Sequence, residues 1–233
     1  MTSTICIDPR FRGPPESGNG GYVAGLLARA LGASDCRVRL HRPPPLATPL
    51  AVMTDTDGVR LMHGGELIAT AAPASVEVEA PPPVTMAEAR KARSRFTGFR
   101  RHVFPGCFVC GPQREEGDGL LIFPGACTGG AVSAPWRPTP DLRGEDGLIR
   151  SEFVWAALDC PGYFAVEDQA GPAVLGEMAV RIHALPAGEE PLVVVGWHVA
   201  SEGRKHRAGT AIFDGAALVA SAASTWVSLR RAA

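Results

Sequence analysis

The sequence predicts an α+β protein made of two similar halves. Each half contains one segment with the apolar spacing of a helix, followed by short segments in which apolar and polar residues alternate, and a proline-rich, basic connector separates the halves. Strands joined by short glycine or aspartate turns favour an antiparallel meander. With 233 residues, 45% of them hydrophobic, the chain can bury one large core or two smaller ones that share an interface.

The first helix is predicted over residues 20–31. Its apolar side chains recur at helical spacing, at Val23, Leu26, Leu27, Ala30 and Leu31. Gly32 supplies a stop, and Asn19 stands where an N-cap is expected. The second helix is predicted to begin at residue 151, with Ser151 as its N-cap and its apolar positions at Val154, Ala157 and Leu158. Pro161 should kink or end it.

Alternation with period two predicts the strands. In the first half they cover about 4–10, 36–40, 50–54, 59–63 and 66–71; in the second, 119–126, 129–138, 178–184, 192–201, 208–214 and 217–229. The domains predicted are an N-terminal half at 1–79, a linker at 80–117 and a C-terminal half at 118–233. The linker carries a basic, helix-like piece at 86–101 and a cysteine-containing turn. Its arginines and lysine could contact phosphates, or the piece is a solvated linker helix.

Four segments resemble the hotdog thioesterase superfamily in its fused, double-hotdog form. They are SGNGGYVAGLLARAL at the first helix, WAALDCPGYFA at the second, GCFVCGP followed by GLLIF, and the terminal EGRKHRAGTAIFDGAALVASAASTWV. The resemblance covers most of the chain. It implies two antiparallel sheets, each wrapping one central helix, and a thioesterase that hydrolyses acyl-CoA or another acyl thioester. Because fused halves mimic a hotdog dimer, two chains are expected to pair further, as a homodimer.

The resemblance also implies an active site divided between the halves. In the phenylacetate-pathway type, a Gly-Gly pair at a helix start holds the thioester oxygen, and an Asp about nine positions into the partner's helix is base or nucleophile. Asn19, Gly20 and Gly21 match that opening, but Ala28 stands at the position of the acid. The second helix has Asp159 and no Gly pair. Nine residues span roughly 13 Å of helix, so one helix cannot supply both parts, whereas two antiparallel helices would assemble one site per chain.

Each of these residues also has a purely structural interpretation. Asn19 could orient a water or the carbonyl, or only cap its helix. Asp159 is either a buried carboxylate that activates water or attacks the carbonyl, or an exposed residue on the outer face of its helix. Gly20 and Gly21 would stabilise the developing oxyanion through their backbone N–H groups.

The cysteines and the basic cluster allow alternatives as well. Cys107 and Cys110 form a C-x-x-C that could be half a zinc site or a redox pair, but Cys127, Cys160 and His102 lack a matching spacing, so we expect a structural turn, no metal and no cofactor. Arg204, Lys205 and Arg207, with His206 among them, could bind the phosphates of coenzyme A or form a solvated hairpin tip.

Several function classes are disfavoured. A formal net charge of −1 offers no footprint for nucleic acid. The N-terminus lacks the pattern of a secretion signal and no stretch is long enough to span a membrane, so a cytoplasmic location with reduced cysteines is expected. No G-x-S-x-G, G-x-G-x-x-G or P-loop motif occurs. The remaining rivals are a degenerate double hotdog that binds an acyl chain or acyl-CoA without turnover, and, more weakly, a hotdog dehydratase.

Overall fold

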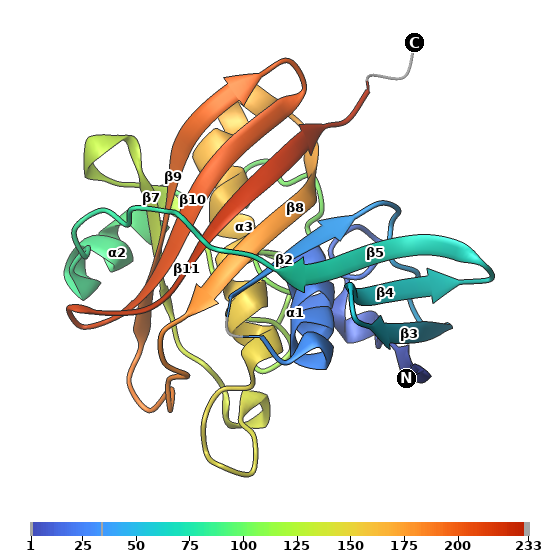
Figure 1. Cartoon of the computed structure of the whole chain (residues 1–233). Coiled ribbons are helices and arrows are strands. Elements are labelled where there is room, and N and C mark those ends of the chain that lie inside the picture. The colour runs from blue at the N-terminus through green and yellow to red at the C-terminus, as the bar shows by residue number, and fades with distance from the viewer. Residues whose placement is uncertain (1, 34, 231–233) are drawn as a thin grey trace.

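The computed structural model describes residues 2–33 and 35–230, which form one antiparallel sheet of 11 strands with two helices against one of its faces (Figure 1). The first half contributes β1 (Thr2–Cys6), β3 (Pro49–Asp55), β4 (Gly58–His63), β5 (Glu66–Pro73) and β2 (Asp35–Leu40), in that spatial order. The second continues with β8 (Ala173–Ile182), β11 (Ala217–Ser228), β10 (Lys205–Asp214), β9 (Leu192–Glu202), β7 (Val132–Trp136) and β6 (Gly125–Ala126). The predicted α+β class and antiparallel meanders are confirmed.

The two half-sheets are joined edge to edge, so the two sheets expected from the sequence are continuous. The joint is the short ladder between β2 and β8, which runs from Asp35↔Arg181 to Arg39↔Glu177. Beyond these pairs the strands separate, and Figure 1 shows the two halves diverging from this point. Each half still wraps its own helix, α1 (Gly20–Leu31) in the first and α3 (Ser151–Ala170) in the second.

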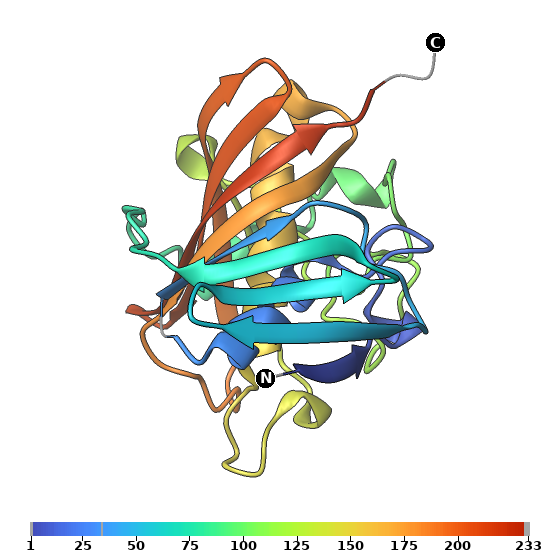
Figure 2. The same ribbon diagram turned by 45° about the vertical axis from the view of Figure 1, so that its right-hand side comes forward.

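The two helices cross in close contact, and two glycines make this possible. A Cβ on Gly21 would lie 2.6 Å from Asp159 Cβ, and one on Gly25 would lie 2.5 Å from Glu152 Cα. These distances are far below a normal contact of about 3.5–4.0 Å between carbon atoms. Residue numbers therefore increase along α1 while those of the facing residues on α3 decrease. The helices are antiparallel, as the divided site expected from the sequence requires. Figure 2 shows both behind the sheet.

The second helix differs from the prediction at both ends. Arg150 is its N-cap and makes no side-chain cap, so Ser151 is the first helical residue instead. The helix also continues through Pro161 to Ala170. Two features explain this: α3 is buried against the sheet along most of its length, and the carbonyl of Leu158, in the turn that Pro161 disturbs, accepts a hydrogen bond from Thr210 Oγ1 at 2.9 Å.

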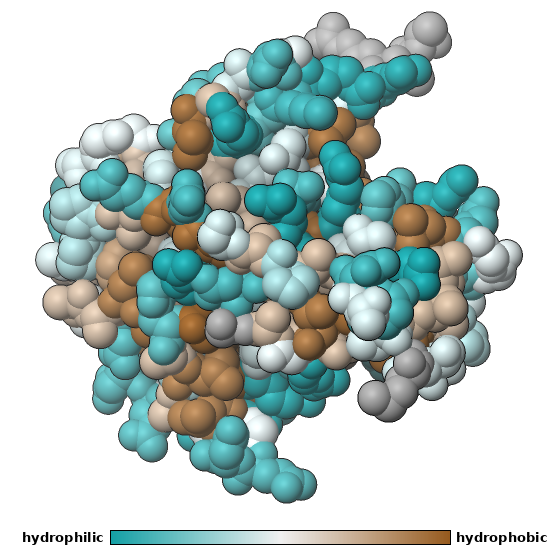
Figure 3. Space-filling view, viewed as in Figure 1, coloured by the Kyte–Doolittle hydropathy of each residue, from teal (hydrophilic) through white to brown (hydrophobic). Residues whose placement is uncertain are grey.

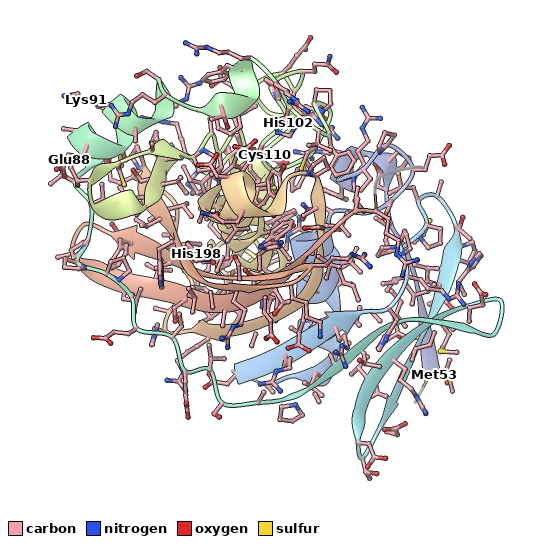
Figure 4. All side chains as sticks on the ribbon, turned by 90° about the horizontal axis from the view of Figure 1, so that it is seen from above. Met53, Glu88, Lys91, His102, Cys110 and His198 are labelled. Carbon is pink, nitrogen blue, oxygen red and sulfur yellow. The ribbon has the colours of Figure 1, made fainter. Side chains whose placement is uncertain are left out.

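The linker is more firmly packed than its composition indicates. Its helix α2 (Met86–Arg93) starts with a Thr85–Glu88 capping box and buries Ala89 and Ala92, while its basic residues stay exposed. Figure 4 shows Glu88 and Lys91 at the outer edge of the molecule. Of the strand predicted over 119–126, only Gly125–Ala126 belongs to a strand of the sheet, as β6. Short 3-10 helices occupy Pro9–Phe11, Thr97–Phe99, Thr128–Gly130 and Pro140–Leu142.

The outer surface mixes polar and apolar side chains on the face shown in Figure 3. Within the described residues, no helix is both long enough and apolar enough to cross a bilayer.

Candidate active site

Asp159 projects from the middle of α3 into the start of α1. Its side chain is buried, with the residue only 2% exposed. One carboxylate oxygen, Oδ2, accepts hydrogen bonds from Asn19 Nδ2 at 2.8 Å and from the backbone N–H of Gly21 at 2.9 Å. The other oxygen, Oδ1, is buried without a hydrogen-bond partner. Asp159 is therefore the buried carboxylate, not the exposed alternative, and one of its oxygens is held while the other is free.

Asn19 caps its helix, which was the structural alternative for this residue, and it also binds Asp159. Its Oδ1 accepts the N–H of Tyr22 at 2.9 Å, which makes it the N-cap of α1. Its Nδ2 donates to Asp159. Because the cap fixes which end of the amide faces Tyr22, it also fixes the amide nitrogen toward the carboxylate.

The surroundings of Asp159 shift its protonation. Burial raises its pKa to about 7, the negative charge of the Cys107 thiolate adds to the rise, and the hydrogen bonds from Gly21 and Asn19 oppose it. The desolvation of the carboxylate is the larger effect. A carboxyl group of this pKa exchanges a proton in the neutral range.

The two glycines at the start of α1 play different parts. The N–H of Gly21 donates to Asp159, so it is not available to a thioester oxygen as the sequence had predicted. The N–H of Gly20 has no acceptor among the described residues, and Gly20 lines the cavity beside Asp159. A free N–H at a helix start, where the helix dipole is positive, can stabilise negative charge on an oxygen.

A cavity of about 310 Å³ lies where β2 and β8 part. This volume is near the lower end of the range for ligand pockets, about 300–1,000 Å³. Asn19, Gly20 and Asp159 lie in its wall. Most of the remaining wall is apolar, including Leu40, Pro43, Pro44, Val103, Phe104, Leu175 and Trp226. The site thus combines a small cluster of polar groups, Asn19, Gly20 and Asp159, with a mostly apolar cavity.

Three buried cysteines line the same cavity. Cys107 and Cys110 come from the linker, and Cys160 follows Asp159 on α3. Hydrogen bonds from the other two thiols and from the backbone N–H groups of Cys110 and Val109 lower the pKa of Cys107, whereas burial raises the pKa of Cys110 and of Cys160. The spacing in the sequence did not associate Cys160 with the C-x-x-C, because only the crossing of the linker over α3 brings the three together.

The predicted phosphate-binding cluster lies away from this cavity wall. Arg204, in the turn between β9 and β10, donates from Nε to the carbonyl of Ser228 at 3.0 Å, and Lys205 and Arg207 are exposed on β10. None of them lines the cavity, although Val227, the strand partner of Lys205, does. The lining residue with a permanent positive charge is Arg42, whose guanidinium lies 3.4 Å from a carboxylate oxygen of Glu66. Sequence reasoning missed Arg42 because nothing in its local pattern marks it.

Comparison with known proteins identifies the fold of the chain. No protein-family model and no curated protein sequence matches the chain. Among solved structures, the TesB protein of Mycobacterium avium subspecies paratuberculosis is similar with a TM-score of 0.64 and 15% identity, over 98% of this chain and 93% of the other. The acyl-CoA thioesterase II TesB2 of Mycobacterium marinum is similar with a TM-score of 0.61 and 12% identity, over 99% and 94%.

A third structure, a conserved protein with a hotdog fold from Alicyclobacillus acidocaldarius, is similar with a TM-score of 0.64 and 12% identity, over 99% of this chain and 94% of that one. All three matches extend over nearly the whole of both chains. Identities this low bear on the fold alone. The chain has the hotdog fold, in a form with two helix-wrapping halves in one polypeptide.

Proposed function

We propose that this protein is an acyl-thioester hydrolase with one active site between its two hotdog halves. The observation that carries the proposal is the Asp159 carboxylate, which is held through Oδ2 by Asn19 and Gly21 and leaves Oδ1 without a partner beside an apolar cavity. Burying a carboxylate without a full set of hydrogen-bond partners is energetically unfavourable. Such carboxylates are commonly found at functional sites.

The reaction follows from these positions. Asp159 Oδ1 accepts a proton from a water molecule in the cavity, and the water oxygen attacks the thioester carbonyl carbon. The carbonyl oxygen becomes negative and accepts the N–H of Gly20 at the positive end of α1. The C–S bond then breaks, the proton passes from Asp159 to the departing thiolate, and the products are a carboxylic acid and a free thiol.

The chemistry of the wall supports an apolar acyl group and a charged carrier. The mostly apolar cavity suits a fatty or aromatic acyl chain. Arg42 offers a cation for the phosphates of coenzyme A, a role for which the sequence had offered Arg204, Lys205 and Arg207 as candidates. The structure from Mycobacterium marinum, which shares the fold, is named as an acyl-CoA thioesterase, and this supports the same substrate class. A homodimer and a cytoplasmic location stay predictions, and sedimentation of the purified protein tests the first.

The decisive experiment is thiol release from short, medium, long and aromatic acyl-CoAs by wild type and by Asp159→Asn. Asn at 159 can still accept the Asn19 and Gly21 hydrogen bonds through its carbonyl oxygen but cannot take a proton from water. We expect turnover to fall by about 10²–10⁴-fold while a non-hydrolysable thioether analogue still binds. Asp168→Asn, an exposed position on the same helix, is the matched control and should retain full turnover.

A non-catalytic acyl-CoA binder gives a different pattern. Wild type would then bind the thioether analogue but release no thiol from any ester. Hydrolysis that survives Asp159→Asn would also overturn the proposed role of Asp159.

A further inference from the structure

We propose that Cys107, Cys110 and Cys160 together bind a thiophilic divalent cation of the zinc class. All three residues are buried and their sulfur atoms lie within 4.8 Å of one another. The sulfurs of Cys107 and Cys160 are 3.7 Å apart. Two sulfurs bound to one zinc ion at about 2.3 Å lie about 3.8 Å apart in tetrahedral geometry. The observed separation matches that of two thiolate ligands on one ion.

The loop between the first two cysteines is built to present a thiolate. The backbone N–H groups of Val109 and Cys110 donate to the sulfur of Cys107, and Asn19 Nδ2 lies 3.9 Å from that sulfur. Hydrogen bonds to a charged acceptor are stronger than those to a neutral one, so these donors favour the ionised form that binds metals.

The same loop is too tight for any side chain at the residue after the second cysteine. Gly111 donates its N–H to the carbonyl of Cys107 at 2.9 Å, and a Cβ on Gly111 would lie 2.5 Å from that carbonyl oxygen. The glycine of the C-x-x-C-G sequence is therefore required by the tight turn that carries Cys107 and Cys110.

The third ligand comes from a different part of the chain. Cys160 lies on α3, so an ion bound by the three sulfurs would join the linker to the helix that carries Asp159. His102 lines the same cavity, but its Nδ1 accepts the N–H of Phe104 at 3.0 Å, which leaves the proton on Nε2 and makes that nitrogen a donor instead of a ligand. Figure 4 shows His102 and Cys110 on the same side of the molecule, far from Met53. The fourth position on the ion is left to water or a small ligand from the cavity.

The test is titration of the reduced, full-length protein with Co²⁺, followed by displacement with Zn²⁺. We expect one equivalent per chain, with the intense near-ultraviolet absorption of sulfur-to-cobalt charge transfer. Cys110→Ser and Cys160→Ser should lose that absorption. Cys127→Ser, a half-exposed cysteine outside the cluster, is the matched control and should keep it.

A second measurement does not depend on whether the variants fold. X-ray absorption of the wild-type protein loaded with one equivalent of Zn²⁺ should show three sulfur neighbours at about 2.3 Å. The proposal is overturned if the reduced wild type binds neither metal, if the bound zinc has only nitrogen and oxygen neighbours, or if Cys110→Ser folds and keeps the cobalt absorption. No readout uses thioester hydrolysis, so this inference and the proposed function can fail separately.

Discussion

Replacement of Gly21 by alanine tests whether the close approach of the two central helices holds the site together. The added Cβ would lie 2.6 Å from Asp159 Cβ and 2.7 Å from the carbonyl oxygen of Trp155. Backbone atoms of a buried helix cannot swing aside as a long side chain can. The start of α1 must therefore retreat by about 0.9 Å or more to reach an ordinary contact distance.

Two costs follow from that retreat and one gain offsets them in part. Overpacking of a tight interface costs about 1–3 kcal/mol. The hydrogen bond from the Gly21 N–H to Asp159, now 2.9 Å, would lengthen beyond its useful range, which costs about 1.5–3 kcal/mol for a charged acceptor. Alanine restricts the unfolded chain and returns about 0.4–1 kcal/mol. We expect a net loss of about 1.5–5.5 kcal/mol in the free energy of unfolding.

The assay is urea unfolding followed by fluorescence and circular dichroism, together with thiol release from the best acyl-CoA. Gly25→Ala is the informative partner, because its Cβ would meet Glu152 and not Asp159, so it should lose stability with a smaller loss of turnover. Gly106→Ala is the milder control, since the three atoms nearest to that Cβ all belong to the guanidinium of Arg12, the closest at 3.2 Å, and not to a helix. A Gly21→Ala protein with wild-type stability and turnover would refute the account of the helix contact.

Three further substitutions test other parts of the site. Asn19→Ala removes both the cap on Tyr22 and a hydrogen bond to Asp159, so it should lower the free energy of unfolding by about 2 kcal/mol in urea melts and reduce thiol release at least tenfold. Arg42→Ala should raise KM for acyl-CoA severalfold without changing KM for an acyl-pantetheine that lacks the nucleotide. If Arg204→Ala raised KM for acyl-CoA equally, this would contradict the proposal that the coenzyme A phosphates bind at Arg42. Thr210→Val removes the side-chain donor to the buried carbonyl of Leu158 and buries a methyl group in its place, which should cost about 0.5–1.5 kcal/mol. An unchanged thermal midpoint would mean that this hydrogen bond does not stabilise the turn around Pro161.

The sequence predicted the parts of the site whose signals are local or follow from chain geometry. The cap at Asn19, the glycine pair and the stop at Gly32 are read from neighbours within one helix. The divided site was implied by the family resemblance, and it required antiparallel helices because the rise of a helix keeps its start far from an acid nine residues later. The helices are antiparallel, because Gly21 faces Asp159 while Gly25 faces Glu152.

Errors arose where burial overrode a local preference. Pro161 was expected to kink or end its helix, but α3 continues beyond it to Ala170 because it is packed on the sheet there, so tertiary contacts outweigh the local preference for an end. The basic cluster at 204–207 was chosen for its charge and does not line the cavity, and its binding of phosphates stays a prediction. Charge alone does not say on which face of a strand a side chain lies or where a cavity opens.

The sequence by itself determined the α+β class, the two helices with their strand meanders, and the residue types at the start of α1 and on α3, because each depends on periodicity or capping within a short segment. Only the tertiary structure decided that Gly21 binds Asp159 while the N–H of Gly20 stays free, that Arg42 is the cation in the cavity wall, and that Cys160 joins the C-x-x-C of the linker. These relations join residues far apart in the chain, and their distances are set by how the helices, the linker and the sheet pack.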